Sequence, residues 1–260
     1  MRRVERLCAA ALALGVAGCG SGREAVLRPV VVAAVGEPAS VLPPLAVETV
    51  ARDIGDLVYG RLADLERGKP PIDPTAYRPR LAERWERVDS LTWRFHLARG
   101  ARWADGEPVT AEDVRFSFDA FSDSVLDAVA RPVLAGRVRV TVEDPRTFLI
   151  GFRDAYPEQL YDATYHVRIL PRHLWASVPR AAWAADTVIG RLVGSGPYRV
   201  REWKRGQYLA LEARDATNRR EGPRTIVWRF TQDPDAALNL VLAHEADLME
   251  LAAGLADPRG

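Results

Sequence analysis

The segment RVRVTVEDPRTFLIGF, residues 137–152, constrains the fold most strongly because its pattern is typical of a β-hairpin. Valines alternate with polar residues over 138–142, EDPR supplies a turn, and apolar residues alternate back over 148–152. A second hairpin is predicted at 198–212, with KRGQ as its turn. In the returning segment, either the set that begins at Tyr208 or the set that begins at Leu209 alternates to pair back. Two antiparallel hairpins exclude a purely parallel sheet.

Helical patterns alternate with these sheet-forming segments. Apolar residues recur three and four apart over 45–65, which predicts a helix with one buried stripe. Thr110 followed by Asp113 is an acidic variant of the capping box, so a second helix should begin at Ala111 and turn Val114, Phe118 and Phe121 inward. Further helices are expected within 157–187, interrupted at Pro171 and Pro179, and after Asp233 or Asp235.

Three further strands complete the pattern. VVVAAV at 30–35 is a short apolar β-branched run, and it leads into the loop GEPAS. Residues 91–97 alternate apolar with polar side chains, and TIVWRF at 225–230 is the third strand. The proline-rich segment 67–80 reads as an irregular connection. Strands, helices and hairpins in this order predict a mixed α/β fold.

The charge balance limits the classes of partner. Lysine and arginine number 36 and aspartate and glutamate 35, so the formal net charge is +1. A chain without an overall basic field lacks the electrostatic basis for nucleic-acid binding, and we expect no nucleic-acid partner.

The N-terminus has the composition of an export signal. Three arginines are followed by a short apolar run and small residues ahead of Cys19. The stretch VAGC resembles a bacterial lipobox, in which the cysteine is lipidated and becomes the first mature residue. We therefore predict a signal peptide at 1–18, lipidation of Cys19 and a polar tether over 19–28. An exported protein, periplasmic or at the cell surface and anchored to the membrane through Cys19, is the expected result.

No constellation in the sequence indicates catalysis or a bound metal, and no cofactor is expected. Ser195 lies between two glycines, but a nucleophile elbow places its glycines two residues away, between a strand and a helix. The four histidines lack the spacing of a metal site. Acidic pairs such as Glu112 with Asp113 open predicted helices, where they serve as caps. We predict no catalytic and no metal-ligating residues.

Four blocks in order resemble one family, the bacterial extracellular solute-binding proteins of the oligopeptide, dipeptide and nickel type. The blocks are PRLAERWERVDSLTWRFHLARGARWADGEPVTAEDVRFSFDAF, ILPRHLW, GSGPYRVREWKRGQYLALEARDA and DPDAALNLVLAHEADLME. The resemblance implies a periplasmic-binding-protein-like fold of type II: a first lobe, made of residues 29–48 and 185–260, with an extra mixed α/β subdomain, residues 49–184, packed on it. The chain ends where the second lobe would begin, so that lobe is expected to be absent.

The resemblance also implies a function: a lipid-anchored substrate-binding protein that delivers peptides or similar small solutes to the permease subunits of an ABC importer. Peptide, nickel chelate and sugar all stay open as ligands. The loop from Glu37 to Ser40 is the expected cleft-lining segment, with Glu37 and Ser40 as the candidate ligand-binding residues. The alternatives are a secreted hydrolase that uses Ser195 with His173 or His166, and a surface lipoprotein without a transport role.

Overall fold

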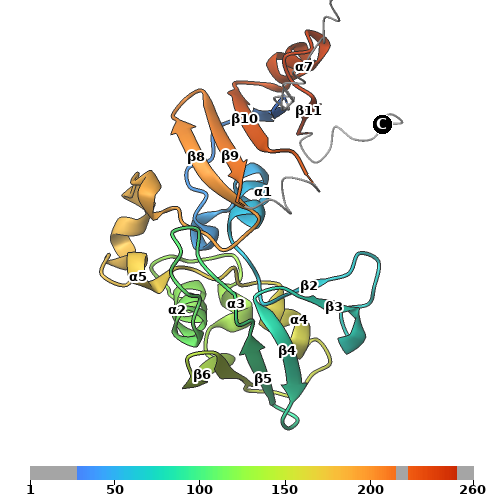
Figure 1. Ribbon diagram of the computed structural model, residues 1–260, viewed down its shortest axis with the longest axis vertical. Helices are drawn as coiled ribbons and strands as arrows, with labels where there is room; N and C mark the ends of the chain where they lie inside the picture. The colour runs from blue at the N-terminus through green and yellow to red at the C-terminus, as the bar shows by residue number, and fades with distance from the viewer. Residues whose placement is uncertain (1–27, 215–221, 251–260) are drawn as a thin grey trace, which may run out of the picture.

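The computed structural model describes residues 28–214 and 222–250, and it contains two main sheets (Figure 1). The first sheet is mixed, with five strands in the order β11-β1-β10-β9-β8. Its strands are β1 (Val30–Val35), β8 (Tyr198–Lys204), β9 (Tyr208–Ala213), β10 (Thr225–Thr231) and β11 (Leu248–Met249). β1 runs parallel to β10 and β11, whereas β9 is antiparallel to β10 and β8.

The second sheet is antiparallel, with four strands in the order β4-β5-β7-β6. These strands are β4 (Ala82–Arg87), β5 (Thr92–Leu97), β6 (Val138–Asp144) and β7 (Thr147–Phe152), and a separate two-stranded ribbon pairs β2 (Ala63–Leu65) with β3 (Tyr77–Pro79). The helices are α1 (Thr49–Val58), α2 (Ala111–Ser122), α3 (Arg131–Leu134), α4 (Gln159–Thr164), α5 (Arg172–Trp175) and α7 (Pro234–Leu242), with 3₁₀ turns at 43–45, 74–76, 180–185 and 189–191.

The first sheet is covered on both faces, which its inner strand β1 requires because its residues are apolar throughout. Val32 and Ala34 point into a core shared with α1 and with β8 to β10. Ala33 points the other way, into a small cluster beneath α7. Figure 1 shows α1 and α7 beside this sheet in the upper half of the molecule, and α2, α3 and α4 with the second sheet in the lower half.

The second sheet builds its own core from the alternation visible in the sequence. The inward-facing residues of β5 and β7 (Trp93, Phe95, Leu97, Phe148, Ile150 and Phe152) are buried, and Phe95 stacks on Phe148 with ring centroids 5.5 Å apart. Phe118 and Phe121 of α2 close the same core. The predicted hairpins, the strands at 30–35, 91–97 and 225–230 and the inward face of α2 are confirmed.

Both predicted caps are present as hydrogen bonds. The Thr110 amide donates to Asp113 Oδ2 at 2.7 Å and the Asp113 amide donates to Thr110 Oγ1 at 3.4 Å, which confirms the capping box of α2. Asp233, rather than Asp235, caps α7 by accepting from the Ala236 amide at 2.7 Å.

The helix predicted over 45–65 was too long at both ends. α1 begins at Thr49 and leaves Val47 exposed, and it ends at Val58, whose carbonyl accepts a hydrogen bond from the Gly196 amide at 2.8 Å. Residues 63–65 then form a strand. Two more strands were missed, β3 inside the predicted connection 67–80 and β4, whose sequence AERWER carries too few apolar residues to show alternation.

Candidate functional site

A pocket of about 410 Å³ opens between the two cores, and we call it the inter-core pocket. It meets the usual description of a ligand site, a concave and mostly apolar surface with a few convergent polar groups. Its lining residues are Pro43, Ala46, Arg52, Gly55, Phe121, Val129, Ala130, Val133, Tyr165, His166 and Arg168.

Three separate parts of the chain build this pocket. The 3₁₀ turn after β1 and the helix α1 supply one wall, and the end of α2 with α3 supplies the apolar floor. The third wall is the segment after α4, residues 165–168. Val129 stays 68% exposed at the rim, and Tyr165 stays 42% exposed. These two side chains are therefore available to contact a group that enters the pocket.

A cluster of charged side chains adjoins the pocket and contributes Arg168 to its lining. Arg168 Nε donates to Asp56 Oδ1 at 2.6 Å, and Arg61 contacts the same carboxylate at 2.9 Å. His166 Nε2 lies 3.1 Å from Asp162 Oδ1. Two arginines thus share one aspartate, so this group of three carries a net positive charge.

A stack of aromatic rings supports the third wall. Tyr161 and Tyr165 lie parallel with ring centroids 4.6 Å apart, and His166 meets both rings edge-on at 5.5 and 5.4 Å. The Arg61 guanidinium lies 5.0 Å from the Tyr165 ring centroid. Burial, with a further contribution from Tyr165, raises the pKa of Tyr161, so its ring stays neutral and can remain stacked.

The loop from Glu37 to Ser40, which the sequence predicted as cleft-lining, does not line the inter-core pocket and lies at the carboxyl ends of β1 and β10. Trp203 Nε1 donates to Glu37 Oε1 at 2.7 Å, and the Gly206 amide donates to Oε2 at 2.8 Å. Arg205 also donates to Oε1 at 3.3 Å, with its guanidinium 3.6 Å from the Trp203 ring centroid. Glu37 therefore ties its own loop to the β8–β9 turn.

Ser40 and Cys19 complete the predicted set. The Ser40 hydroxyl accepts from the Leu42 amide at 3.1 Å, and Ser40 also lines a small cavity of about 70 Å³ with Trp203 and Arg205. The structure therefore brings the Glu37 loop and Ser40 to one cluster, and the inter-core pocket lies apart from it. Cys19 lies outside the described residues.

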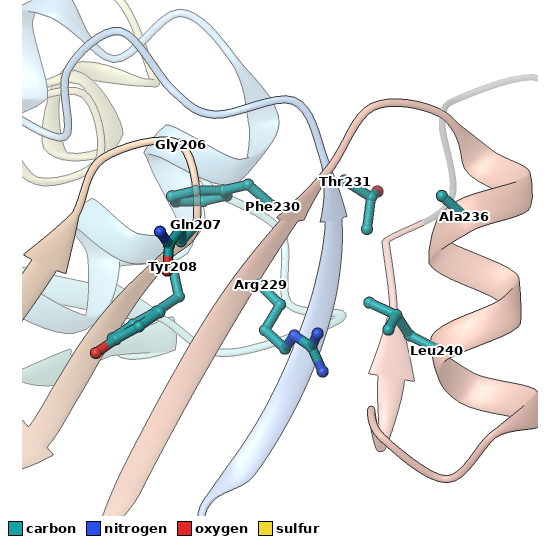
Figure 2. Close-up of a pocket in the computed structure, with 8 residues that line it drawn as sticks. All are labelled: Gly206, Gln207, Tyr208, Arg229, Phe230, Thr231, Ala236 and Leu240. Carbon is teal, nitrogen blue, oxygen red and sulfur yellow. The ribbon is translucent and has the colours of Figure 1, made fainter.

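A second hollow, of about 430 Å³, adjoins the β8–β9 turn (Figure 2). Figure 2 shows Ala236 and Leu240 projecting from α7 toward Thr231 of β10. Arg229 in this hollow pairs with Glu245 at 2.8 Å. We call it the strand-end hollow and treat it as the competing site, because ligands of open α/β sheets bind outside the carboxyl ends of strands.

Ser195 performs a structural role in the loop before β8. Its hydroxyl accepts from the Gly60 amide at 3.2 Å, while His173 pairs instead with Asp105 at 2.8 Å. Within residues 28–214 and 222–250, no hydrogen bond joins Ser195 to a histidine. The Ser195 hydroxyl thus joins the loop before β8 to the residues that follow α1.

Comparison with known proteins places this architecture in a family. The family model of the bacterial extracellular solute-binding proteins, family 5 Middle, matches residues 76–258. The chain belongs to the bacterial extracellular solute-binding proteins of family 5. The resemblance predicted from the four sequence blocks is confirmed.

Individual relatives of this family 5 chain agree. The oligopeptide-binding protein AppA of Bacillus subtilis is 25% identical over 86% of this chain and 40% of its own length. A Brucella ovis protein named for ABC transporter peptide binding reaches 33% identity over 58% of this chain and 28% of its own. The chain spans less than half of the length of these curated relatives.

Solved structures show the same fold. AppA from Bacillus subtilis, in complex with a nonapeptide, superposes with a TM-score of 0.72 at 23% identity, over 86% of this chain and 44% of AppA. NikZ from Campylobacter jejuni, in complex with Ni(L-His), gives 0.67 at 21% identity over 84% and 42%. The predicted fold class is confirmed: the mixed α/β architecture matches type II periplasmic binding proteins over an extent that corresponds to one lobe.

The described residues of the family 5 chain contain neither a metal-ligand cluster nor a membrane-spanning helix. Over 28–214 and 222–250, no three histidine, cysteine, aspartate or glutamate side chains are grouped as metal ligands. In the same part of the chain, no helix has the length and apolarity needed to span a bilayer.

Sequence reasoning missed the residues that line the inter-core pocket. Arg52 and Arg168 are two of many arginines, and each follows an ordinary local pattern. Only the position of Arg168 just before ILPRHLW, one of the family blocks, could have drawn attention to it. The pocket depends on contacts between segments more than a hundred residues apart, such as the bond from Arg168 to Asp56.

Proposed function

We propose that this chain is the first-lobe part of an exported substrate-binding protein, which captures peptides or similar small solutes for the permease of an ABC importer. Family membership and the names of its relatives support this proposal. The observation that most supports this proposal is the inter-core pocket with its exposed apolar rim, because a site that is half of a clamp leaves apolar surface uncovered. No catalytic residue has a part in this function.

The lobe boundaries are part of the same proposal. Residues 29–48 and 185–260 would form the lobe, and 49–184 the subdomain packed on it. Residues of both the lobe and the subdomain would then line the inter-core pocket. Glu37 and Ser40 remain predicted ligand contacts, and the contacts of Glu37 with the β8–β9 turn would fix the shape of the loop that presents them.

The affinity expected of this chain is low, because a clamp gains affinity by contacting its ligand from both lobes. Calorimetric titration with a pool of short peptides should therefore give little heat, with dissociation constants in the millimolar range. Submicromolar binding by this chain alone would contradict the one-lobe account.

Association with an importer tests the transport role. Affinity purification of the chain from its native membranes should recover ABC permease subunits. Recovery of other envelope proteins without any permease would favour a surface lipoprotein without a transport role.

Membrane anchoring should depend on Cys19. The change Cys19→Ser removes the thiol that lipidation requires, so the chain should move from the membrane fraction to the soluble exported fraction, and mass spectrometry should show no attached lipid. Cys8→Ser is the matched control because Cys8 lies inside the predicted signal peptide, and it should leave fractionation unchanged. Membrane association that persists in the Cys19 variant would contradict the anchor.

A further inference from the structure

The charged residues that line the inter-core pocket are all basic, and this limits the solutes that it can accept. Arg52, His166 and Arg168 line it, and no aspartate or glutamate does. Two acids outside the lining pair with it: Asp56 accepts from Arg168, and Asp162 lies beside His166. A solute in the pocket therefore meets guanidinium and imidazole groups before any carboxylate.

Arg52 is the residue most available to a ligand. It is exposed on α1, and it donates to Thr49 Oγ1 at 3.3 Å. Among the described residues it forms no ion pair within 4.0 Å. Burial and the charge of Asp56 raise the pKa of the neighbouring Asp53, and the charge of Arg52 opposes that rise. A guanidinium has five donors, so most of those of Arg52 remain for an oxyanion.

The aspartate beside the pocket does not neutralise it. Arg61 and Arg168 both contact Asp56, so that group of three keeps one positive charge in excess, and Arg52 lies in the lining while its neighbour Asp53 does not. The remaining lining is apolar, with Phe121, Val129 and Val133 on the floor. Apolar area favours a hydrocarbon group, while the two arginines favour an anion beside it.

We propose that the inter-core pocket selects solutes that carry a carboxylate or phosphate next to an apolar group, with Arg52 as the specificity-determining contact. This inference rests on the proposed function, since it names the class of solute for the same site. The anion lies between Arg52 and Arg168, and the hydrocarbon group lies over the floor formed by α2 and α3.

The dipeptide Ala-Phe and its C-terminal amide test this inference, because they differ only in the carboxylate. Amide resonances of the ¹⁵N-labelled chain are followed while each probe is added at millimolar concentration. Ala-Phe should bind about fivefold more tightly than its amide, as expected for partly exposed charge pairs. Inorganic phosphate that displaces Ala-Phe would indicate a general oxyanion subsite, whereas no displacement would indicate selection for the carboxylate together with the apolar group.

The variant Arg52→Gln assigns the effect to one residue. It should weaken Ala-Phe binding by about threefold and leave binding of the amide unchanged, because only the carboxylate contacts the guanidinium. Arg99→Gln, at an exposed turn outside the pocket, is the matched control and should change neither. Amide resonances that do not shift at residues away from the substituted position show that each variant is folded.

The outcomes separate the two proposals. Equal binding of Ala-Phe and its amide would overturn the selection for anions while leaving solute binding at this pocket intact. Absence of binding by either probe would overturn both. Discrimination that persists in Arg52→Gln would overturn the assignment to Arg52.

Discussion

Gly194→Ala and Gly196→Ala are each expected to destabilise the fold by about 3–5 kcal/mol, which is a large part of the stability of an ordinary domain. A Cβ atom at Gly194 would lie 1.8 Å from the Val58 carbonyl oxygen, and one at Gly196 would lie 2.5 Å from that of Leu57. Both obstacles are backbone atoms at the end of α1, so no side-chain movement relieves them.

The loop would have to move away, and three hydrogen bonds would be lost with it. The Gly196 amide donates to Val58 O at 2.8 Å, the Gly60 amide donates to Ser195 Oγ at 3.2 Å, and the Ala104 amide donates to Gly194 O at 2.9 Å. These bonds join the segment before β8 to both cores. Each contributes about 1 kcal/mol, and the remaining cost comes from overpacking.

Thermal and urea unfolding followed by circular dichroism measure this effect. Gly100→Ala is the matched control, because a Cβ atom there meets nothing within 4 Å and the backbone is not in the left-handed region. The control should stay within about 0.5 kcal/mol of the parent chain. Near-parent stability of Gly194→Ala would mean that the loop does not approach α1 as closely as described.

Asp113→Ala is expected to cost about 2–4 kcal/mol, the second largest effect. The side chain is buried, and its Oδ2 accepts from both the amide and the hydroxyl of Thr110. Its Oδ1 accepts from the Arg172 amide at 2.9 Å, which joins the start of α2 to α5. The substitution removes a cap worth about 1 kcal/mol and leaves the part-buried Arg172 amide without its acceptor, at a further cost of about 1–3 kcal/mol.

Chemical denaturation of two further variants checks this assignment. Asp113→Asn retains one acceptor oxygen, so its loss of stability should be intermediate. Asp235→Ala removes an exposed acid from the first turn of α7, where Asp233 already serves as the cap, and should cost under about 0.5 kcal/mol. Equal losses for Asp113→Ala and Asp235→Ala would contradict the special position of Asp113.

Local features of the fold were predictable because their causes lie within a few residues. The capping box needs only Thr110 and Asp113, and the hairpin at 137–152 needs its turn and its alternation. The bulge between Val200 and Glu202 was not visible, and it places Trp203 rather than Glu202 in register with Leu209. Periodicity alone cannot reveal an extra residue in a strand.

Features set by distant contacts were not predictable. The end of α1 at Val58 is fixed by the loop at 194–196, more than 130 residues away, and helical periodicity continues past it. Glu37 stays a predicted ligand contact, but the hydrogen bonds that hold it could not be predicted. Its partner Trp203 comes from another hairpin, and no pattern around Glu37 indicates that pairing.

The inter-core pocket is the clearest example of a feature that local sequence patterns could not predict. Its walls come from residues 43–55, 121–133 and 165–168, and each segment alone is unremarkable in sequence. The prediction of a solute-binding protein therefore succeeded from family blocks, while the candidate pocket required the structure. A sequence specifies such a site only through the packing of its whole fold.

The most direct test of the account is to map where a pool of short peptides perturbs the amide spectrum of the labelled chain. The account predicts shifts at Ala46, Gly55, Ala130 and Arg168, around the inter-core pocket. Shifts confined to Thr231, Ala236 and Leu240, around the strand-end hollow, would contradict it, and so would a spectrum that no peptide changes.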